Sequence, residues 1–255
     1  MKTLITGGSS GIGKSIAKEL HNKGHEIILV ARDIKKLEDT KKEIGNNVKI
    51  IATDISNMDN CKKLYNDLKN ENIDILINSA GIGLHGKFIN DDVDKQLDMI
   101  DLNIKATQIL TRLFLKDFIK RDSGYILNIS STAAFSPGPL MASYFASKAY
   151  VLRLTEAISE EIRQENSKVY IGCLCPGPVD TNFNNNLGVK FNKAQNSDEL
   201  AKYAVKKMFD KKTVIIPTFN HKINSFFNKF VPKKMLLKAN YNVQIKKIIN
   251  AKKTQ

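Results

Sequence analysis

The sequence predicts an α/β fold: a single domain built on a doubly wound parallel sheet of about seven strands. The chain has 255 residues of which 42% are hydrophobic, enough for one large domain with a substantial core. Apolar runs typical of strands alternate with helical patterns along residues 1–217. Most of these runs, such as IILV and ILIN, are continuously apolar, as expected when both faces of a parallel sheet are covered.

The expected elements alternate strictly along the chain. The strand candidates are Lys2–Thr6, Glu26–Arg32, Val48–Asp54, Ile73–Ala80, Gly124–Ser131, Lys168–Cys175 and Thr213–Pro217. Helical patterns lie between them, over residues 12–23, 34–44, 57–70, 91–121, 144–165 and 197–210. Right-handed β-α crossovers place the ligand crevice at the C-terminal ends of the strands. No linker interrupts residues 1–217, so we expect one domain there and a separate extension over residues 218–255.

The turn after the first strand has the composition of a phosphate-binding loop. It reads GGSSGIG, and Gly7, Gly11 and Gly13 let the backbone turn tightly and approach a ligand. The helix that begins near Ile12 offers free N–H groups and a positive dipole end to a pyrophosphate. The G-x-x-x-G-x-G spacing differs from the commoner G-x-G-x-x-G. Its position between the first strand and the first helix nevertheless predicts a dinucleotide site.

The end of the second strand bears on which dinucleotide binds. A carboxylate there favours the ribose hydroxyl of NAD(H), but the chain has Ala31–Arg32–Asp33. Arg32 can meet a 2′-phosphate with several donors, whereas Asp33 suits the N-cap of the next helix. The sequence therefore favours NADP(H) over NAD(H).

Composition limits the other possibilities. No apolar run is long enough for a transmembrane helix, and the N-terminus enters a strand pattern with no room for a signal peptide. The three cysteines, Cys61, Cys173 and Cys175, are not spaced as a zinc site, and we expect no metal. Free thiols fit a reducing cytoplasm, which is the expected location.

Positive charge is concentrated at the C-terminus. The net charge is +14, and residues 211–255 contain eleven lysines and no acidic residue. Such asymmetry is typical of contact with an anionic partner, although lysine is abundant throughout the chain. No nucleic-acid-binding motif accompanies the lysines, so no nucleic acid is expected.

A tyrosine four residues before a lysine is a candidate proton-transfer pair, because a nearby ammonium stabilises a phenolate. The spacing alone proves nothing, since the chain has 35 lysines and contains three such pairs: Tyr65/Lys69, Tyr144/Lys148 and Tyr203/Lys207. Only the second follows a serine at a strand end. We expect Ser131 and Tyr144 to face the crevice, because one closes the fifth strand and the other opens the next helix.

Several motifs in register resemble those of the short-chain dehydrogenase/reductase family, over about residues 3–217. They are TGGSSGIG at 6–13, NSAG at 78–81 with Ser79 in place of a second Asn, Asn103 in DLNIKA, Ser131 in LNISSTAA, Tyr144 with Lys148, and PGPVDT at 176–181. The resemblance implies a Rossmann-type fold and the catalytic set Asn103, Ser131, Tyr144 and Lys148. It also implies a homodimer or homotetramer paired through the 91–121 and 144–165 helices.

The resemblance assigns each catalytic residue a role. Tyr144 is expected to protonate the carbonyl oxygen during reduction and to act as base in reverse. Ser131 is expected to hydrogen-bond the same oxygen, with Ser130 as the alternative. Lys148 is expected to hold the nicotinamide ribose, and Asn103 to carry a water that joins Lys148 to solvent.

Further residues are expected to contact the cofactor. Asp54 is expected to meet the adenine with Ile55 beside it, and Thr181 to contact the nicotinamide amide. The full expected set is Gly7, Ser9, Ser10, Gly11, Ile12, Gly13, Arg32, Asp54, Ile55, Asn78, Ala80, Gly81, Tyr144, Lys148, Pro176, Gly177, Val179 and Thr181.

Elementary electrostatics predicts a depressed pKa for Tyr144. A free phenol has a pKa of about 10. A charge about 4 Å away, at an effective dielectric constant of about 20, supplies about 4 kcal/mol. That energy corresponds to about three pKa units. We therefore expect Lys148 to bring the pKa of Tyr144 close to neutrality.

Residues 182–196 read as a mobile substrate lid, being polar apart from a few large apolar side chains. Those side chains, Phe183, Leu187, Val189 and Phe191, either line an apolar pocket or anchor the loop. His85 in GIGLHGKF could touch substrate, although a lone loop histidine is more often incidental. The sequence does not name the substrate.

The C-terminal extension carries two apolar stripes at helical spacing. They consist of Ile223, Phe226, Phe227, Phe230 and Val231, and of Tyr241, Ile245, Ile248 and Ile249. An apolar face with a lysine-rich remainder is typical of an interfacial membrane helix. The alternative, which we favour, is packing on the domain or on a sister subunit.

These observations together predict an NADP(H)-dependent oxidoreductase that interconverts a carbonyl and a secondary alcohol by hydride transfer, with a small-molecule substrate. One alternative is reduction of 3-oxoacyl thioesters, although the Gly-Gly segment usual near the end of that branch is missing. Another is a dinucleotide-sensing protein without turnover. Peripheral membrane contact through the extension is a further expectation.

Overall fold

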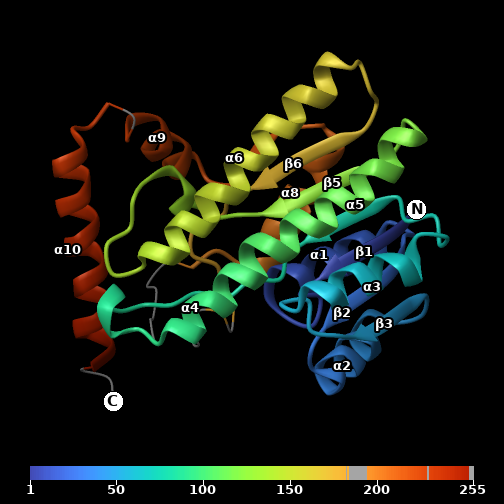
Figure 1. Cartoon of the computed structure of the whole chain (residues 1–255), viewed down its shortest axis with the longest axis horizontal. Helices are drawn as coiled ribbons and strands as arrows, with labels where there is room; N and C mark the ends of the chain where they lie inside the picture. The colour runs from blue at the N-terminus through green and yellow to red at the C-terminus, as the bar shows by residue number, and fades with distance from the viewer. Residues whose placement is uncertain (182, 184–193, 229, 253–255) are drawn as a thin grey trace.

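Seven parallel strands form one sheet in the computed structural model, in the order β3-β2-β1-β4-β5-β6-β7 (Figure 1). The strands are β1 (Lys2–Thr6), β2 (Glu26–Ala31), β3 (Val48–Ala52), β4 (Ile75–Asn78), β5 (Tyr125–Ile129), β6 (Tyr170–Leu174) and β7 (Val214–Ile215). The structure describes residues 1–181, 183, 194–228 and 230–252, with side chains up to Lys246. The strand order reverses between β1 and β4, which creates a crevice at their C-terminal ends. The predicted fold class is confirmed.

Helices cover both faces of the sheet because successive strand residues point to opposite sides. The helices are α1 (Gly11–Asn22), α2 (Ile34–Ile44), α3 (Met58–Leu68), α4 (Val93–Ile100), α5 (Thr107–Lys120), α6 (Ala142–Gln164), α8 (Ser197–Phe209), α9 (Phe219–Phe227) and α10 (Lys233–Lys252). Ile5 of β1 belongs to the core shared with α1, α2 and α8, and its neighbour Leu4 belongs to the core shared with α3, α5 and α6. Each strand is therefore buried on both faces, as its continuous apolar run predicts.

The strands begin and end close to the predicted residues. β1 matches exactly, and the other six are shorter by at most two residues at either end. The predicted residues beyond these bounds lie in the loops at the ends of the strands.

Cys61, Cys173 and Cys175 are buried free thiols. Two short 3-10 turns, Phe88–Asn90 and Thr132–Phe135, had no sequence signal.

The long helix predicted over residues 91–121 is interrupted. Asp101–Ala106 forms a π-helical segment between α4 and α5. Such segments are rare and commonly occur at functional sites. The prediction of one regular helix was wrong because hydrophobic spacing does not distinguish a local widening from regular α-helix. Asn103 lies inside this segment.

The extension forms α9 and α10 at the side of the molecule where α4 and the start of α6 lie (Figure 1). The α9 stripe does not pack on the domain, since Phe226, Phe227 and Phe230 are 55%, 58% and 70% exposed. Tyr241 is also exposed, whereas Ile248 and Ile249 lie outside the described side chains. Packing on the domain is therefore excluded for the α9 stripe. No described helix is both long enough and apolar enough to cross a membrane.

Candidate active site

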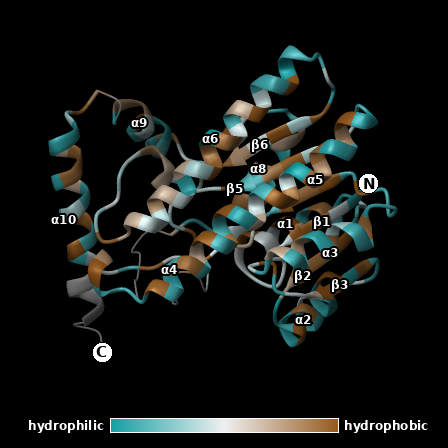
Figure 2. Ribbon diagram, in the orientation of Figure 1, coloured by the Kyte–Doolittle hydropathy of each residue, from teal (hydrophilic) through white to brown (hydrophobic). Residues whose placement is uncertain are grey.

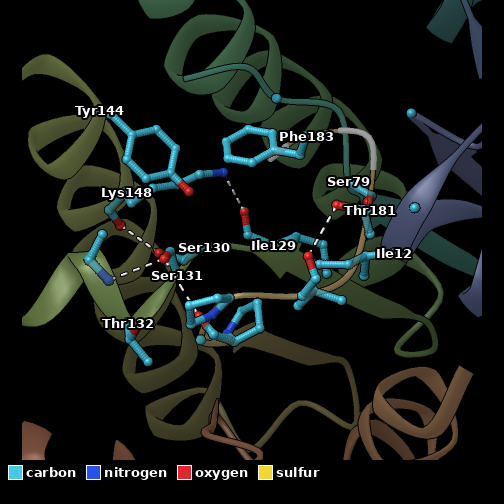
Figure 3. Close-up of a pocket in the computed structure, with 18 of the residues that line it drawn as sticks. Ile12, Ser79, Ile129, Ser130, Ser131, Thr132, Tyr144, Lys148, Thr181 and Phe183 are labelled. Atoms are coloured by element: carbon cyan, nitrogen blue, oxygen red, sulfur yellow. Dashed lines mark hydrogen bonds between the residues drawn. The ribbon is translucent and has the colours of Figure 1, made fainter. Parts of the chain in front are cut away.

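One pocket gathers residues from the C-terminal ends of four strands and from the extension (Figure 3). Its lining joins the loop after β1, the loop after β4, the end of β5, the start of α6 and the segment after β6. The predicted site residues that line it are Gly7, Ser10, Gly11, Ile12, Ala80, Gly81, Ser131, Tyr144, Lys148, Pro176, Gly177, Val179 and Thr181. Those that do not are Ser9, Gly13, Arg32, Asp54, Ile55, Asn78 and Asn103.

The loop after β1 has the geometry of an anion cradle. Gly7 adopts φ +67°, and a Cβ there would lie 2.8 Å from the Ala80 backbone. A Cβ on Gly13 would lie 2.4 Å from the Gly7 carbonyl oxygen. The N-cap residue of α1, Ser10, makes no side-chain capping hydrogen bond. The first N–H groups of α1 therefore remain available to a phosphate, so this part of the site fits a dinucleotide.

Arg32 and Asp54 meet outside the pocket, at the ends of β2 and β3. An Arg32 guanidinium nitrogen lies 3.7 Å from Oδ2 of Asp54, and both side chains are exposed. Asp33 caps α2 by accepting from the Lys36 N–H, as the sequence suggested. The Ile55 side chain is buried in the core, and its carbonyl accepts from Sγ of Cys61 at 3.1 Å.

The loop after β4 is held against β1. Oγ1 of Thr6 accepts hydrogen bonds from the backbone N–H groups of Ser79 and Ala80, at 3.1 and 3.3 Å. Asn78 lies beneath the pocket rather than in its wall. Its Nδ2 donates to Oγ1 of Thr111 and to Oδ1 of Asn128, at 3.0 and 2.8 Å. The polar groups of the Asn78 side chain therefore face this buried network, and its contact with the cofactor stays a prediction.

Tyr144, Lys148 and Ser131 converge in the pocket, as their predicted positions require. Tyr144 is 9% exposed and Lys148 is 6% exposed. Nζ of Lys148 lies 5.9 Å from the centre of the Tyr144 ring and donates to the Ile129 carbonyl at 3.0 Å (Figure 3). The Ser131 hydroxyl lies close enough to the Tyr144 hydroxyl to act on its pKa. The phenol and the ammonium therefore share one desolvated wall of the pocket.

Burial controls the titration of this pair. Desolvation raises the pKa of Tyr144 to about 12, and the Ser131 hydroxyl opposes this shift only in part. Desolvation also lowers the pKa of Lys148 to about 8. The expectation that Lys148 brings the pKa of Tyr144 close to neutrality is wrong for the free chain, because it counted the attraction and omitted the loss of hydration. At neutral pH the phenol is protonated and the ammonium is charged.

The two neighbouring serines have different partners. The Ser130 hydroxyl is buried and donates to the Lys148 carbonyl at 2.7 Å. Oγ of Ser131 accepts from the Ala133 N–H at 3.1 Å and faces Tyr144. Ser131 therefore has the better geometry for contact with a ligand.

Asn103 lies behind Lys148. Its Oδ1 accepts from the Ile82 N–H at 2.9 Å, while its Nδ2 donates to the Ile82 carbonyl and to Oγ of Ser147. A Cβ on Gly81 would lie 3.1 Å from Oδ1 of Asn103 and 3.3 Å from Nζ of Lys148. The absence of a side chain at Gly81 thus leaves room beside both groups.

The segment after β6 closes the pocket above α1. The Thr181 side chain lies against Gly11, since a Cβ there would be 3.1 Å from its methyl carbon. The His221 ring packs on Gly177 and hydrogen-bonds Oγ1 of Thr218 at 2.6 Å. Sequence reasoning did not identify His221, because it lies in the extension, more than forty residues after Gly177.

The structure describes only part of the predicted substrate lid, residues 182–196. Phe183 lines the pocket and its ring centre lies 5.7 Å from that of Tyr144. Leu187, Val189 and Phe191 lie outside the described residues. His85 lines a neighbouring cavity and not the one that contains Tyr144.

The lining residues that were not identified from the sequence include Met141, Phe145 and Gln244. The first two begin α6 beside Tyr144, and their proximity in sequence was an available signal. Gln244 belongs to α10, and nothing in the sequence connects it with the site.

Comparisons with known proteins agree with this arrangement. The family described as short chain dehydrogenase matches residues 2–191. An uncharacterised oxidoreductase of Staphylococcus epidermidis is 35% identical over 181 residues, covering 70% of this chain and 77% of the relative.

Three solved structures are similar over most of the chain. A short-chain dehydrogenase from Sphingobium yanoikuyae in complex with NADPH has a TM-score of 0.81 at 27% identity, covering 88% of this chain and 91% of its own. The bulky-bulky ketone specific alcohol dehydrogenase from Comamonas testosteroni has a TM-score of 0.79 at 27% identity, covering 88% and 90%. A 3-ketoacyl-(acyl-carrier-protein) reductase from Brucella melitensis complexed with NADH has a TM-score of 0.76 at 25% identity, covering 85% and 96%.

Proposed function

The chain belongs to the short-chain dehydrogenase/reductase family, and from this premise we propose that it is an NADP(H)-dependent oxidoreductase that interconverts a ketone and a secondary alcohol. The observation that carries the proposal is the convergence of Ser131 with the buried side chains of Tyr144 and Lys148 in one pocket. These groups share one pocket with the glycine loop and the uncapped start of α1.

Residues of the pocket, together with Arg32 outside it, would hold the dinucleotide. The loop around Gly7 and Gly11 would take the pyrophosphate on free backbone N–H groups. Arg32 would meet the 2′-phosphate, in exchange for its exposed ion pair with Asp54. The exposed pair contributes little to stability, so this exchange is cheap. A similar structure was solved with NADPH, whereas another was solved with NADH, so Arg32 is the argument for NADP(H).

The bound cofactor supplies the hydride, and the chain supplies the proton and its environment. A phenol with a pKa of about 12 is fully protonated at neutral pH, so Tyr144 can donate its proton to a carbonyl oxygen that becomes an alkoxide. Ser131 can donate a hydrogen bond to the same oxygen, because its side chain lines the same pocket as Tyr144. The lysine charge nearby stabilises the phenolate left behind.

The pocket wall around Tyr144 indicates the substrate class. Met141, Phe145 and Phe183 present apolar surface there, and the charged group among the lining residues is Lys148. Such a wall favours a ketone with bulky apolar substituents. The similar Comamonas enzyme, described as specific for bulky-bulky ketones, supports this choice.

Replacing Tyr144 by Phe removes the acid and nothing else. We expect turnover of bulky ketones such as 4-phenylcyclohexanone, followed by NADPH absorbance, to fall by at least about a hundredfold. NADPH binding, followed by fluorescence, should stay within about twofold. Tyr150→Phe is the matched control, since that tyrosine is exposed on the same helix. Substantial activity in Tyr144→Phe contradicts the role of Tyr144 as proton donor. If the unmodified protein binds NADPH but turns over no ketone and no 3-oxoacyl thioester, the proposed oxidoreductase function is contradicted.

Replacing Arg32 by Ala tests the cofactor choice. Loss of its charge-assisted hydrogen bonds to a 2′-phosphate should raise the KM for NADPH by about tenfold or more, with the KM for NADH unchanged. Arg163→Ala serves as control, because that arginine is paired with Glu160 at the far end of α6. A preference for NADH in the unmodified protein, or equal KM values for NADPH in both variants, rejects NADP(H).

A further inference from the structure

Gln244 is a buried polar group that the proposed chemistry does not use. It lies on α10, is 5% exposed and lines the same pocket as Tyr144. Its Oε1 accepts no hydrogen bond within the described chain. A buried oxygen without a partner is unfavourable, so it is typically retained where a ligand or water satisfies it.

Neighbouring contacts fix Gln244 in this position. Asn240, one turn earlier on α10, donates from Nδ2 to Oγ of Ser136 at 3.1 Å and to the Pro137 carbonyl at 2.8 Å. Residues four apart share one face of a helix, so this anchor directs Gln244 towards the loop before α6. Figure 1 shows α10 standing beside that loop. The contacts of α10 therefore position the Gln244 amide, which is not a freely rotating surface side chain.

Apolar groups surround the rest of this wall. Met141, Phe145 and Phe183 line it, and none of them can donate a hydrogen bond to the amide. Under the proposed function, Ser131 and Tyr144 would both be engaged by the reacting carbonyl. The amide oxygen is therefore a second polar point, separate from the reaction centre.

We propose that Gln244 determines specificity by accepting a hydrogen bond from a hydroxyl group of the substrate, at a position separate from the reacting carbonyl. The substrate class is then a ketone with a bulky apolar body and one further hydroxyl. This inference rests on the proposed function. The reaction itself is independent of Gln244.

The test compares ketones that differ by one hydroxyl. The probes are 4-phenylcyclohexanone and its ortho-, meta- and para-hydroxyphenyl analogues, reduced with NADPH. In the unmodified protein at least one hydroxylated ketone should have a kcat/KM about tenfold above the parent, since an unpaired buried acceptor discriminates strongly. Gln244→Met, which keeps the volume, should abolish this ratio while still reducing the parent ketone.

Asn242→Leu is the matched control, because Asn242 is an exposed amide on the same helix. It should keep the ratio of the unmodified protein. The inference is overturned if Gln244→Met keeps the ratio of the unmodified protein, or if the unmodified protein has no preference for a hydroxylated ketone. In either case, reduction of the parent ketone leaves the proposed function intact. If no ketone is reduced at all, the proposed function itself fails. Thermal unfolding of each variant confirms that it is folded.

A second inference comes from an independent feature, the exposed face of α9. We call it the α9 surface and define it by Phe219, Ile223, Phe226, Phe227, Phe230 and Val231. The Phe226 ring contacts those of Phe227 and Phe230, with centres 5.6 and 5.3 Å apart. The aromatic side chains thus cluster on one another in solvent. Exposed clusters of this kind usually mark an interaction site.

Charge indicates what covers the α9 surface. The segment from residue 211 to residue 255 has eleven lysines and no acidic residue, and Lys222, Lys233 and Lys234 flank the aromatic cluster in sequence. A two-fold contact with a second copy would bring the same lysines together without a carboxylate from this segment to offset them. Anionic lipid offers both apolar depth for the phenyl rings and negative charge for the lysines.

We infer that the α9 surface binds peripherally to anionic membranes. The full chain should pellet with vesicles of phosphatidylcholine that contain about one third phosphatidylglycerol, and much less with phosphatidylcholine alone. Phe226→Ser with Phe227→Ser should weaken binding to the anionic vesicles by about tenfold or more.

Phe88→Ser with Ile89→Ser is the matched control. Those side chains are at least as exposed as Phe226 and Phe227 but lie close to Asp91 and Asp92 in the sequence, so their replacement should not weaken binding to anionic vesicles. Equal pelleting of the α9 double variant and the unmodified protein overturns the inference, as does failure of the unmodified protein to bind anionic vesicles. If the α9 double variant instead turns a dimer into a monomer in sedimentation, a second copy covers this face and the membrane inference is wrong.

Discussion

The site depends on one constraint: a lysine ammonium and a tyrosine hydroxyl are held together in a place from which water is largely removed. Nζ of Lys148 is anchored on the Ile129 carbonyl at the end of β5, and Tyr144 stands one turn earlier on α6. Removal from water moves the two pKa values in opposite directions, to about 8 for the lysine and about 12 for the tyrosine. In the free chain, Tyr144 is therefore protonated at neutral pH and can donate its proton. Formation of the phenolate needs a favourable charge or hydrogen bond beyond those of the free pair.

In the proposed function, part of the substrate wall comes from outside the elements that carry the reacting groups. The groups that would perform the proton transfer sit on β5 and α6, which the sheet holds rigidly. The groups that shape the substrate wall come in part from Phe183 and from Gln244 of α10. This division allows the C-terminal helices to vary the substrate without disturbing the pair of Lys148 and Tyr144. It follows the general rule that function is placed on loops and additions around a fixed scaffold.

Much of this could be predicted from sequence because the signals are local. Alternating apolar runs predicted all seven strands, and glycines in a short loop predicted the cradle before α1. Of the three Tyr-x-x-x-Lys pairs, the preceding serine at a strand end singled out Tyr144 and Lys148. In the structure, the hydroxyl of Tyr65 donates to Asp117 of α5, and the hydroxyl of Tyr203 accepts from Lys222. Only Tyr144 and Lys148 line the pocket together.

Other features could not be predicted because they depend on distance in space or on burial. Gln244 lines the pocket from α10, a helix whose sequence pattern shows no connection with the site. The π-helical turn around Asn103 leaves hydrophobic periodicity nearly unchanged. The predicted direction of the shift in the Tyr144 pKa was wrong. The sequence shows that a lysine is near, but it does not show that burial removes water from the phenol.

The central claim is that burial raises the pKa of Tyr144 and keeps its phenol protonated at neutral pH. Its most direct test is an NMR titration of the chain with ¹³C-labelled tyrosine, in the absence of cofactor, with the Tyr144 signal assigned by its loss in Tyr144→Phe. The account predicts that this phenol keeps its proton throughout the neutral range and ionises above the ordinary tyrosine pKa, at about 12. Ionisation of Tyr144 near neutral pH in the free protein would contradict it.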